Sequence, residues 1–167
     1  MASPTDHDNN PQAGDAAPDF TAASSRAQTL DESRFIGKVP FVLVFTSDLQ
    51  DPASARLVND LDRHQEGFGS QRVQLLIVVP EPVDLVQQDS DQRSITAPLL
   101  ADPKREIAAR YGVELDGTGF EAVVVDREGV VVERLPLSGE HAAERLVEEV
   151  RRIVAEHPWS MEPRSRD

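Results

Sequence analysis

The chain has 167 residues and a formal net charge of −13 at pH 7, and its hydrophobic fraction of 39% suffices for the core of one domain. The complete absence of cysteine excludes disulfides, thiolate ligands and thiol nucleophiles. The negative charge disfavours nucleic acid and anionic lipid as partners, because such a surface repels their phosphate groups.

The ordered part of the chain is expected between two polar ends. Residues 1–14 are polar and show no periodicity, which predicts a disordered arm. Residues 158–167 carry two prolines and alternating charge, which predicts a tail after the last helix. Residues 15–157 are therefore expected to form a single domain.

Strand and helix signals alternate through this domain. Residues 41–45 (FVLVF) are a continuous apolar run, typical of a strand buried on both faces. Asp51 followed by Pro52 predicts a helix start, because an N-cap oxygen precedes a proline whose missing N–H costs nothing in the first turn. That helix is expected to run to about Glu66. Residues 73–79 predict a second buried strand.

The second half of the domain adds more helices and a hairpin. The predicted elements are a short helix at 83–88, an extended piece at 99–100, a helix from Asp102 to Tyr111, strands at 122–125 and 130–135, and a last helix capped by Ser138. The first strand–helix–strand unit requires a parallel pair with a right-handed crossover. The hairpin then adds antiparallel strands. This order predicts an α/β domain with a mixed central sheet of roughly four to five strands and helices on both faces.

Four stretches of the chain carry a family resemblance through their order and spacing. They are residues 14–20 (GDAAPDF), 37–45 (GKVPFVLVF), 98–113 (PLLADPKREIAARYGV) and 123–129 (VVVDREG). Together they resemble the peroxiredoxins of the alkyl hydroperoxide reductase and thiol-specific antioxidant group. The resemblance implies a thioredoxin-like fold over about residues 14–155, and it implies redoxin chemistry of the antioxidant kind.

The resemblance also implies where the family's catalytic groups would lie. The family's active site is a Thr-Pro-x-Cys-like turn at the first helix, together with an arginine that enters the second half of the sheet. On this chain Asp51 takes the threonine position, Pro52 the proline, Ser54 the peroxidatic cysteine and Phe120 the arginine. Only the proline is kept. With Phe45, these residues are expected to line a vestigial ligand pocket in which Phe120 fills the space of the arginine.

Each departure from the family pattern weakens the parent reaction. A serine hydroxyl is barely ionised near neutral pH and is a poor nucleophile towards peroxide. Losing the arginine removes the charge that would lower a pKa there, and Asp51 adds negative charge. We therefore expect a redox-inactive pseudoenzyme that acts by binding a protein or a small ligand. The alternative is a thiol peroxidase whose native cysteine has been replaced by Ser54 through engineering.

Other catalytic arrangements around Ser54 find little support in the sequence. His64 is the nearest histidine, but ten helical residues separate the two by ~15 Å along the axis. Asp62, His64 and Glu66 are splayed around a helix by their spacing, and no metal-binding motif occurs. We expect no catalytic residue, no metal and no cofactor.

The remaining expectations concern the setting of the protein. No apolar run approaches the ~20 residues of a membrane span, and the N-terminus lacks a secretory signal, which predicts a cytoplasmic protein without a membrane partner. A homodimer or another protein partner is possible for this fold. The excess of Arg over Lys on an acidic chain resembles proteins from salt-loving organisms, although a well-solvated acidic surface explains it equally well.

Overall fold

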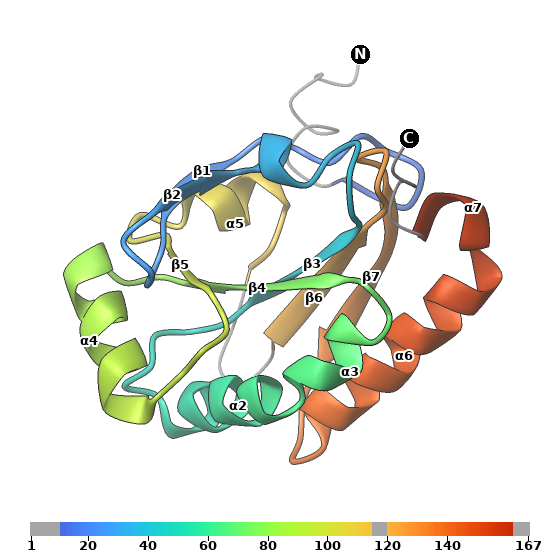
Figure 1. The fold of residues 1–167 in the computed structure, drawn as a ribbon. Helices are drawn as coiled ribbons and strands as arrows, with labels where there is room; N and C mark the ends of the chain where they lie inside the picture. Colours follow the sequence, from blue (N-terminus) through green and yellow to red (C-terminus); the bar gives the residue numbers. More distant parts are fainter. Residues whose placement is uncertain (1–10, 115–119, 162–167) are drawn as a thin grey trace.

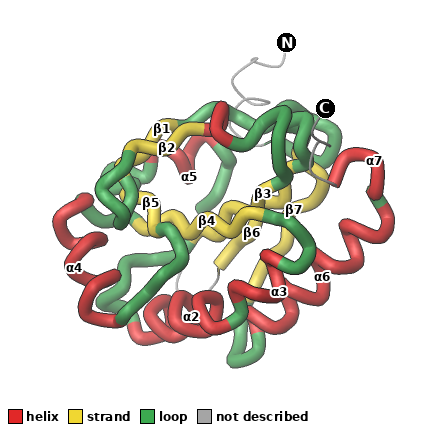
Figure 2. Tube along the Cα trace, in the orientation of Figure 1, coloured by secondary structure: helices red, strands yellow, loops and turns green. Residues whose placement is uncertain are grey.

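The computed structural model describes residues 11–114 and 120–161, and its core is a five-stranded mixed sheet (Figures 1 and 2). The strands are β3 (Phe41–Phe45), β4 (Gln74–Val79), β5 (Leu99–Ala101), β6 (Phe120–Val125) and β7 (Val131–Leu137). They lie in the order β5-β4-β3-β6-β7. The pairs β3–β4 and β4–β5 are parallel, whereas β3–β6 and β6–β7 are antiparallel. The predicted mixed sheet is confirmed.

Helices cover both faces of this sheet, as Figure 1 shows. They are η1 (Glu32–Arg34, a 3₁₀ helix), α2 (Pro52–Arg63), α3 (Gln65–Gly69), α4 (Val83–Arg93), α5 (Glu106–Arg110), α6 (Ala142–Glu156) and α7 (Pro158–Met161). Helices α2, α3, α4 and α6 pack on one face. Helix α5 packs on the other face, together with a small antiparallel hairpin of β1 (Thr21–Ala23) and β2 (Thr29–Asp31).

The continuous apolar run of β3 serves two separate cores. Val42 and Val44 point towards α2 and α6. Phe41, Leu43 and Phe45 point towards α5 and the β1–β2 hairpin. Successive side chains of a strand alternate between faces, so a strand covered on both sides is apolar throughout.

The β1–β2 hairpin was not predicted from the sequence. Each of its strands has only three residues, too few to show an alternating pattern. Its position depends on tertiary packing, since the ring of Phe20 lies 6.2 Å from that of Phe41 in an edge-to-face arrangement.

The predicted helix start at Asp102 is wrong by one turn. The buried carboxylate of Asp102 accepts hydrogen bonds from the backbone N–H groups of Ile107 and Ala108, each at 3.1 Å. These bonds hold a tight turn in which Arg105 has a φ of 55°. Helix α5 therefore begins only at Glu106.

The predicted cap of the last helix at Ser138 is also wrong. Helix α6 begins at Ala142, and the backbone carbonyl of Ser138 accepts a hydrogen bond from the Arg145 guanidinium at 2.7 Å. Residues 158–161, where the tail was expected to begin, form helix α7. Met161 of this helix is fully buried in the core on the α6 side, which holds the helix against the domain. The outer domain boundaries stay predictions.

None of the helices in the described part of the chain combines the length and the apolar character that crossing a membrane requires.

Candidate functional site

The positions implied by the family resemblance gather at one edge of the sheet. Strands β3 and β4 are parallel, so their carboxyl ends lie at the same edge. From there residues 46–51 lead into α2 and residues 80–82 lead into α4. Phe45, the last residue of β3, pairs with Glu121, so β6 begins at this edge too. In open α/β sheets this edge is the usual location of a binding site.

Ser54 and Asp51 contact each other in the first turn of α2. Asp51 is the N-cap residue, as predicted, with an extended backbone. The predicted capping bond is wrong, however, because the Asp51 carboxylate accepts no backbone N–H of the helix. Its Oδ2 instead accepts a hydrogen bond of 3.2 Å from the hydroxyl of Ser54, which is fully buried.

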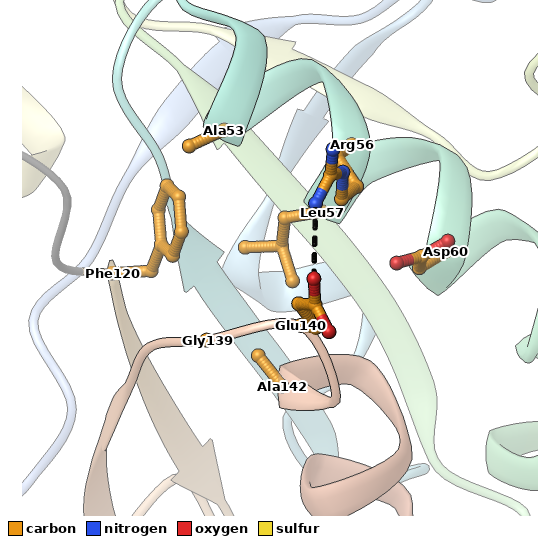
Figure 3. A pocket seen from close by; sticks show the side chains of 8 residues that line it. All are labelled: Ala53, Arg56, Leu57, Asp60, Phe120, Gly139, Glu140 and Ala142. Atoms are coloured by element: carbon orange, nitrogen blue, oxygen red, sulfur yellow. Dashed lines mark ion pairs between the residues drawn. The ribbon is translucent and has the colours of Figure 1, made fainter.

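Phe120 lies beside the first turn of the same helix. It is buried and faces α2 and α6 from the start of β6. Figure 3 shows its ring next to Ala53 at the edge of a hollow of about 280 Å³. The hollow is lined by Ala53, Arg56, Leu57, Asp60, Phe120, Gly139, Glu140 and Ala142. The structure thus brings Phe120 close to the Asp51–Ser54 turn.

The other predicted lining residues have different surroundings. The ring of Phe45 lies on the opposite face of the sheet, with its centroid 5.7 Å from that of Tyr111. Pro52 is exposed at the start of α2. Because β3 is apolar on both faces, its pattern does not reveal which face meets α2, so nothing in the sequence separates Phe45 from Phe120.

The hollow has an apolar floor and a charged rim. Leu57 and Phe120 form the floor, and both are buried. At the rim, Nη1 of Arg56 lies 3.9 Å from Oε1 of Glu140 (Figure 3). Both side chains are largely exposed, so this ion pair contributes little stability and its groups are accessible to a ligand.

Sequence reasoning missed both residues of this rim pair. Arg56 and Glu140 are 84 residues apart in the chain, and they meet only because α2 packs beside α6. The exposed face of a helix and a polar loop gave no signal of this pairing.

In the described part of the chain, no histidine is arranged as a base for Ser54. His64 lies at the other end of α2, where its Nδ1 is 2.8 Å from the backbone carbonyl of Asp60. Within residues 11–114 and 120–161, no group of three or more His, Cys, Asp or Glu side chains is arranged to hold a metal ion.

Comparisons with known proteins agree with this architecture. The model of the AhpC/TSA family matches residues 13–134. No curated protein matches the chain. Among solved structures, peroxidoxin BcpB from Mycobacterium tuberculosis has a TM-score of 0.74 at 21% identity, covering 85% of this chain and 97% of that one. The mitochondrial 2-Cys peroxiredoxin from Plasmodium falciparum has a TM-score of 0.74 at 18% identity, covering 88% and 96%.

A further solved structure shares the fold although its sequence is more distant. It is a Cys-to-Ser mutant of peroxiredoxin Q from Xanthomonas campestris, with a TM-score of 0.70 at 15% identity, covering 80% of this chain and 90% of that one. These likenesses establish the thioredoxin-like fold predicted from the sequence. Because the family model spans most of the chain, the protein belongs to the AhpC/TSA family.

Proposed function

We propose that the protein is a redox-inactive member of the AhpC/TSA family that binds a small ligand in the hollow between α2, Phe120 and the start of α6. One observation carries the proposal. The chain has no cysteine, and the hydroxyl of Ser54, which the family resemblance assigns to the position of the reactive sulfur, donates to the carboxylate of Asp51.

The arrangement opposes peroxide reduction in three ways. The hydroxyl of Ser54 is too weak an acid to supply an anionic nucleophile at neutral pH. The carboxylate of Asp51 adds negative charge where the reaction would build more. Phe120 offers no positive charge in compensation. A lone carboxylate is also too weak a base to activate a serine hydroxyl, so a serine hydrolase is not favoured.

The hollow limits the kind of ligand. Its volume of about 280 Å³ is at the small end for ligand sites, which favours a molecule of a few atoms to fragment size. Phe120 and Leu57 suit an apolar group of the ligand. Arg56 can donate a hydrogen bond to the ligand, and Glu140 can accept one from it. A neutral molecule with an apolar body and one polar end matches this lining best.

The test combines ligand identification with blocking of the hollow. Protein purified from its native source is examined by native mass spectrometry, and a fragment library is screened by NMR. The Ala53→Leu variant narrows the hollow, whereas Ala109→Leu makes the same change on the exposed side of α5. We expect Ala53→Leu to weaken binding by about tenfold or more and Ala109→Leu to bind normally.

Two results would overturn the proposal. One is the absence of any co-purified ligand together with no fragment shifts at Phe120. The other is equal affinity of the Ala53→Leu and Ala109→Leu variants, which would place the ligand elsewhere.

A further inference from the structure

Two buried carboxyl groups lie beside the segment that leads into α2. Glu81 follows β4 and is 4% exposed, and Asp89 lies on α4 and is 8% exposed. Oε2 of Glu81 accepts a hydrogen bond of 2.9 Å from the backbone N–H of Leu49. Oε1 of Glu81 and Oδ2 of Asp89 are both buried, and neither has a hydrogen-bond donor among the residues that the structure describes.

The two acceptors without donors explain each other. The carboxyl group of Asp89 lies close enough to that of Glu81 to raise its pKa. An ionised carboxylate can only accept, so two neighbouring carboxylates cannot bond to one another. One proton between them turns one oxygen into a donor and satisfies both atoms, which a buried site strongly favours. Burial raises the pKa of Glu81, the N–H of Leu49 lowers it, and the carboxyl of Asp89 and the charge of Asp48 raise it further.

The charged groups around the pair come from both neighbouring elements. Asp48 of segment 46–51 adds negative charge. Arg93 of α4 reaches the same segment, where its Nη2 donates to the carbonyl of Leu49 at 3.4 Å. A metal ion is the alternative means of holding two carboxylates together, but the described residues offer no third ligand of that kind.

We propose that a single proton shared by Glu81 and Asp89 fastens segment 46–51 to α4, and that losing this proton as pH rises loosens the segment. The inference is independent of the proposed ligand. It concerns the backbone around Leu49, which is itself buried and lies two residues before Asp51.

The direction of the pH effect follows from proton counting. In the unfolded chain Glu81 loses its proton near its ordinary pKa of 4.5. The native pair keeps the proton to a higher pH, so over that window the native state binds more protons than the unfolded state. Stability from this pair is therefore complete below pH 4.5 and falls as pH rises through the raised native pKa.

The experiment is amide hydrogen exchange at Leu49, measured by NMR from about pH 5 to about pH 8 and corrected for intrinsic exchange. Glu81→Gln is the key variant, because its amide can donate to Asp89 and accept from Leu49 at every pH. Glu148→Gln removes one charge from the exposed face of α6 and serves as the matched control.

We expect protection at Leu49 to fall by about tenfold or more across this range in the wild type and in Glu148→Gln, and to stay constant in Glu81→Gln. The proposal is overturned if Glu81→Gln keeps the wild-type pH dependence. Restoration of protection at the high-pH end by added Mg²⁺ or Ca²⁺ also overturns it, because an ion rather than a proton would then join the carboxylates.

A second measurement decides the question if Glu81→Gln fails to fold. The carboxyl carbon of Glu81 is titrated by NMR in the wild-type protein. A proton held against Asp89 predicts that the Glu81 signal titrates above the ordinary range of a glutamate. Titration of Glu81 within that ordinary range would contradict it.

Discussion

The hydroxyl of Ser54 donates a hydrogen bond of 3.2 Å to Oδ2 of Asp51 within the first turn of α2. The carboxylate of Asp51 therefore binds the side chain of residue 54 and accepts no backbone N–H of the helix. A helix start normally favours an anion at this place. Here an anion is already present as part of the chain, and the proposed redox inactivity rests on the repulsion that it would exert on a second anion at residue 54.

Asp62 joins α2 to the segment before β5. Its Oδ1 accepts hydrogen bonds from the backbone N–H groups of Thr96 and Ala97, each at 2.9 Å. Asp62→Ala leaves these donors without a partner and should lower the free energy of unfolding by about 2 kcal/mol in urea denaturation. Asp91→Ala on the exposed side of α4 should cost less than about 0.5 kcal/mol. Equal losses in the two variants would show that the Asp62 bonds are unimportant.

Tyr111 is the only tyrosine in the chain, so tyrosinate absorbance reports it alone. Its hydroxyl donates to the carbonyl of Pro18 at 2.7 Å. Burial raises its pKa above the ordinary value of 10.0, with smaller contributions from Glu32 and Asp19. Stability from this group is complete below pH 10.0 and is lost as pH rises further, because only the unfolded chain ionises there.

The absorbance titration should therefore show no tyrosinate until the protein unfolds in alkali. Circular dichroism followed in the same sample should change together with the absorbance. A reversible titration with an ordinary pKa in protein that remains folded would contradict the burial of this hydroxyl.

Phe120 contributes to the core as well as to the hollow. Phe120→Ala should lower the free energy of unfolding by about 3 kcal/mol, near the lower end for such substitutions because the ring borders a hollow. Phe120→Leu keeps most of the apolar volume and should cost about 1 kcal/mol. A Phe120→Ala protein as stable as the wild type would show that this ring is not packed as described.

The net charge of −13 should make stability depend on salt. Monovalent salt screens repulsion between like charges, since the Debye length is only ~10 Å at 0.1 M. The melting temperature should rise from low to moderate salt in differential scanning calorimetry. A flat or falling curve would mean that self-repulsion is not a main cost to this fold.

The main sheet and the first helix were predictable because local sequence determines them. The continuous apolar runs of β3 and β4 are typical of strands buried on both faces. Asp51 followed by Pro52 is a strong local signal for the start of a helix. The site was predictable only in part. The ring of Phe45 packs against Tyr111, on the face of the sheet opposite to Phe120. Arg56 of α2 lies beside Glu140, which precedes α6. Both contacts join segments that are far apart in the chain. Local pattern carries no information on such pairings.

Peroxide turnover by the Ser54→Cys variant tests the central claim most directly, namely that Asp51 and Phe120 oppose thiol chemistry at residue 54. Stopped-flow assays with hydrogen peroxide and cumene hydroperoxide should show no rate above buffer for the wild type. Ser54→Cys should remain nearly inactive, with a thiol pKa above its ordinary value of about 8.5, since the Asp51 carboxylate lies beside it. Rapid peroxide turnover by Ser54→Cys, with no other residue changed, would contradict the proposed redox inactivity. It would favour a peroxidase whose cysteine was replaced by Ser54.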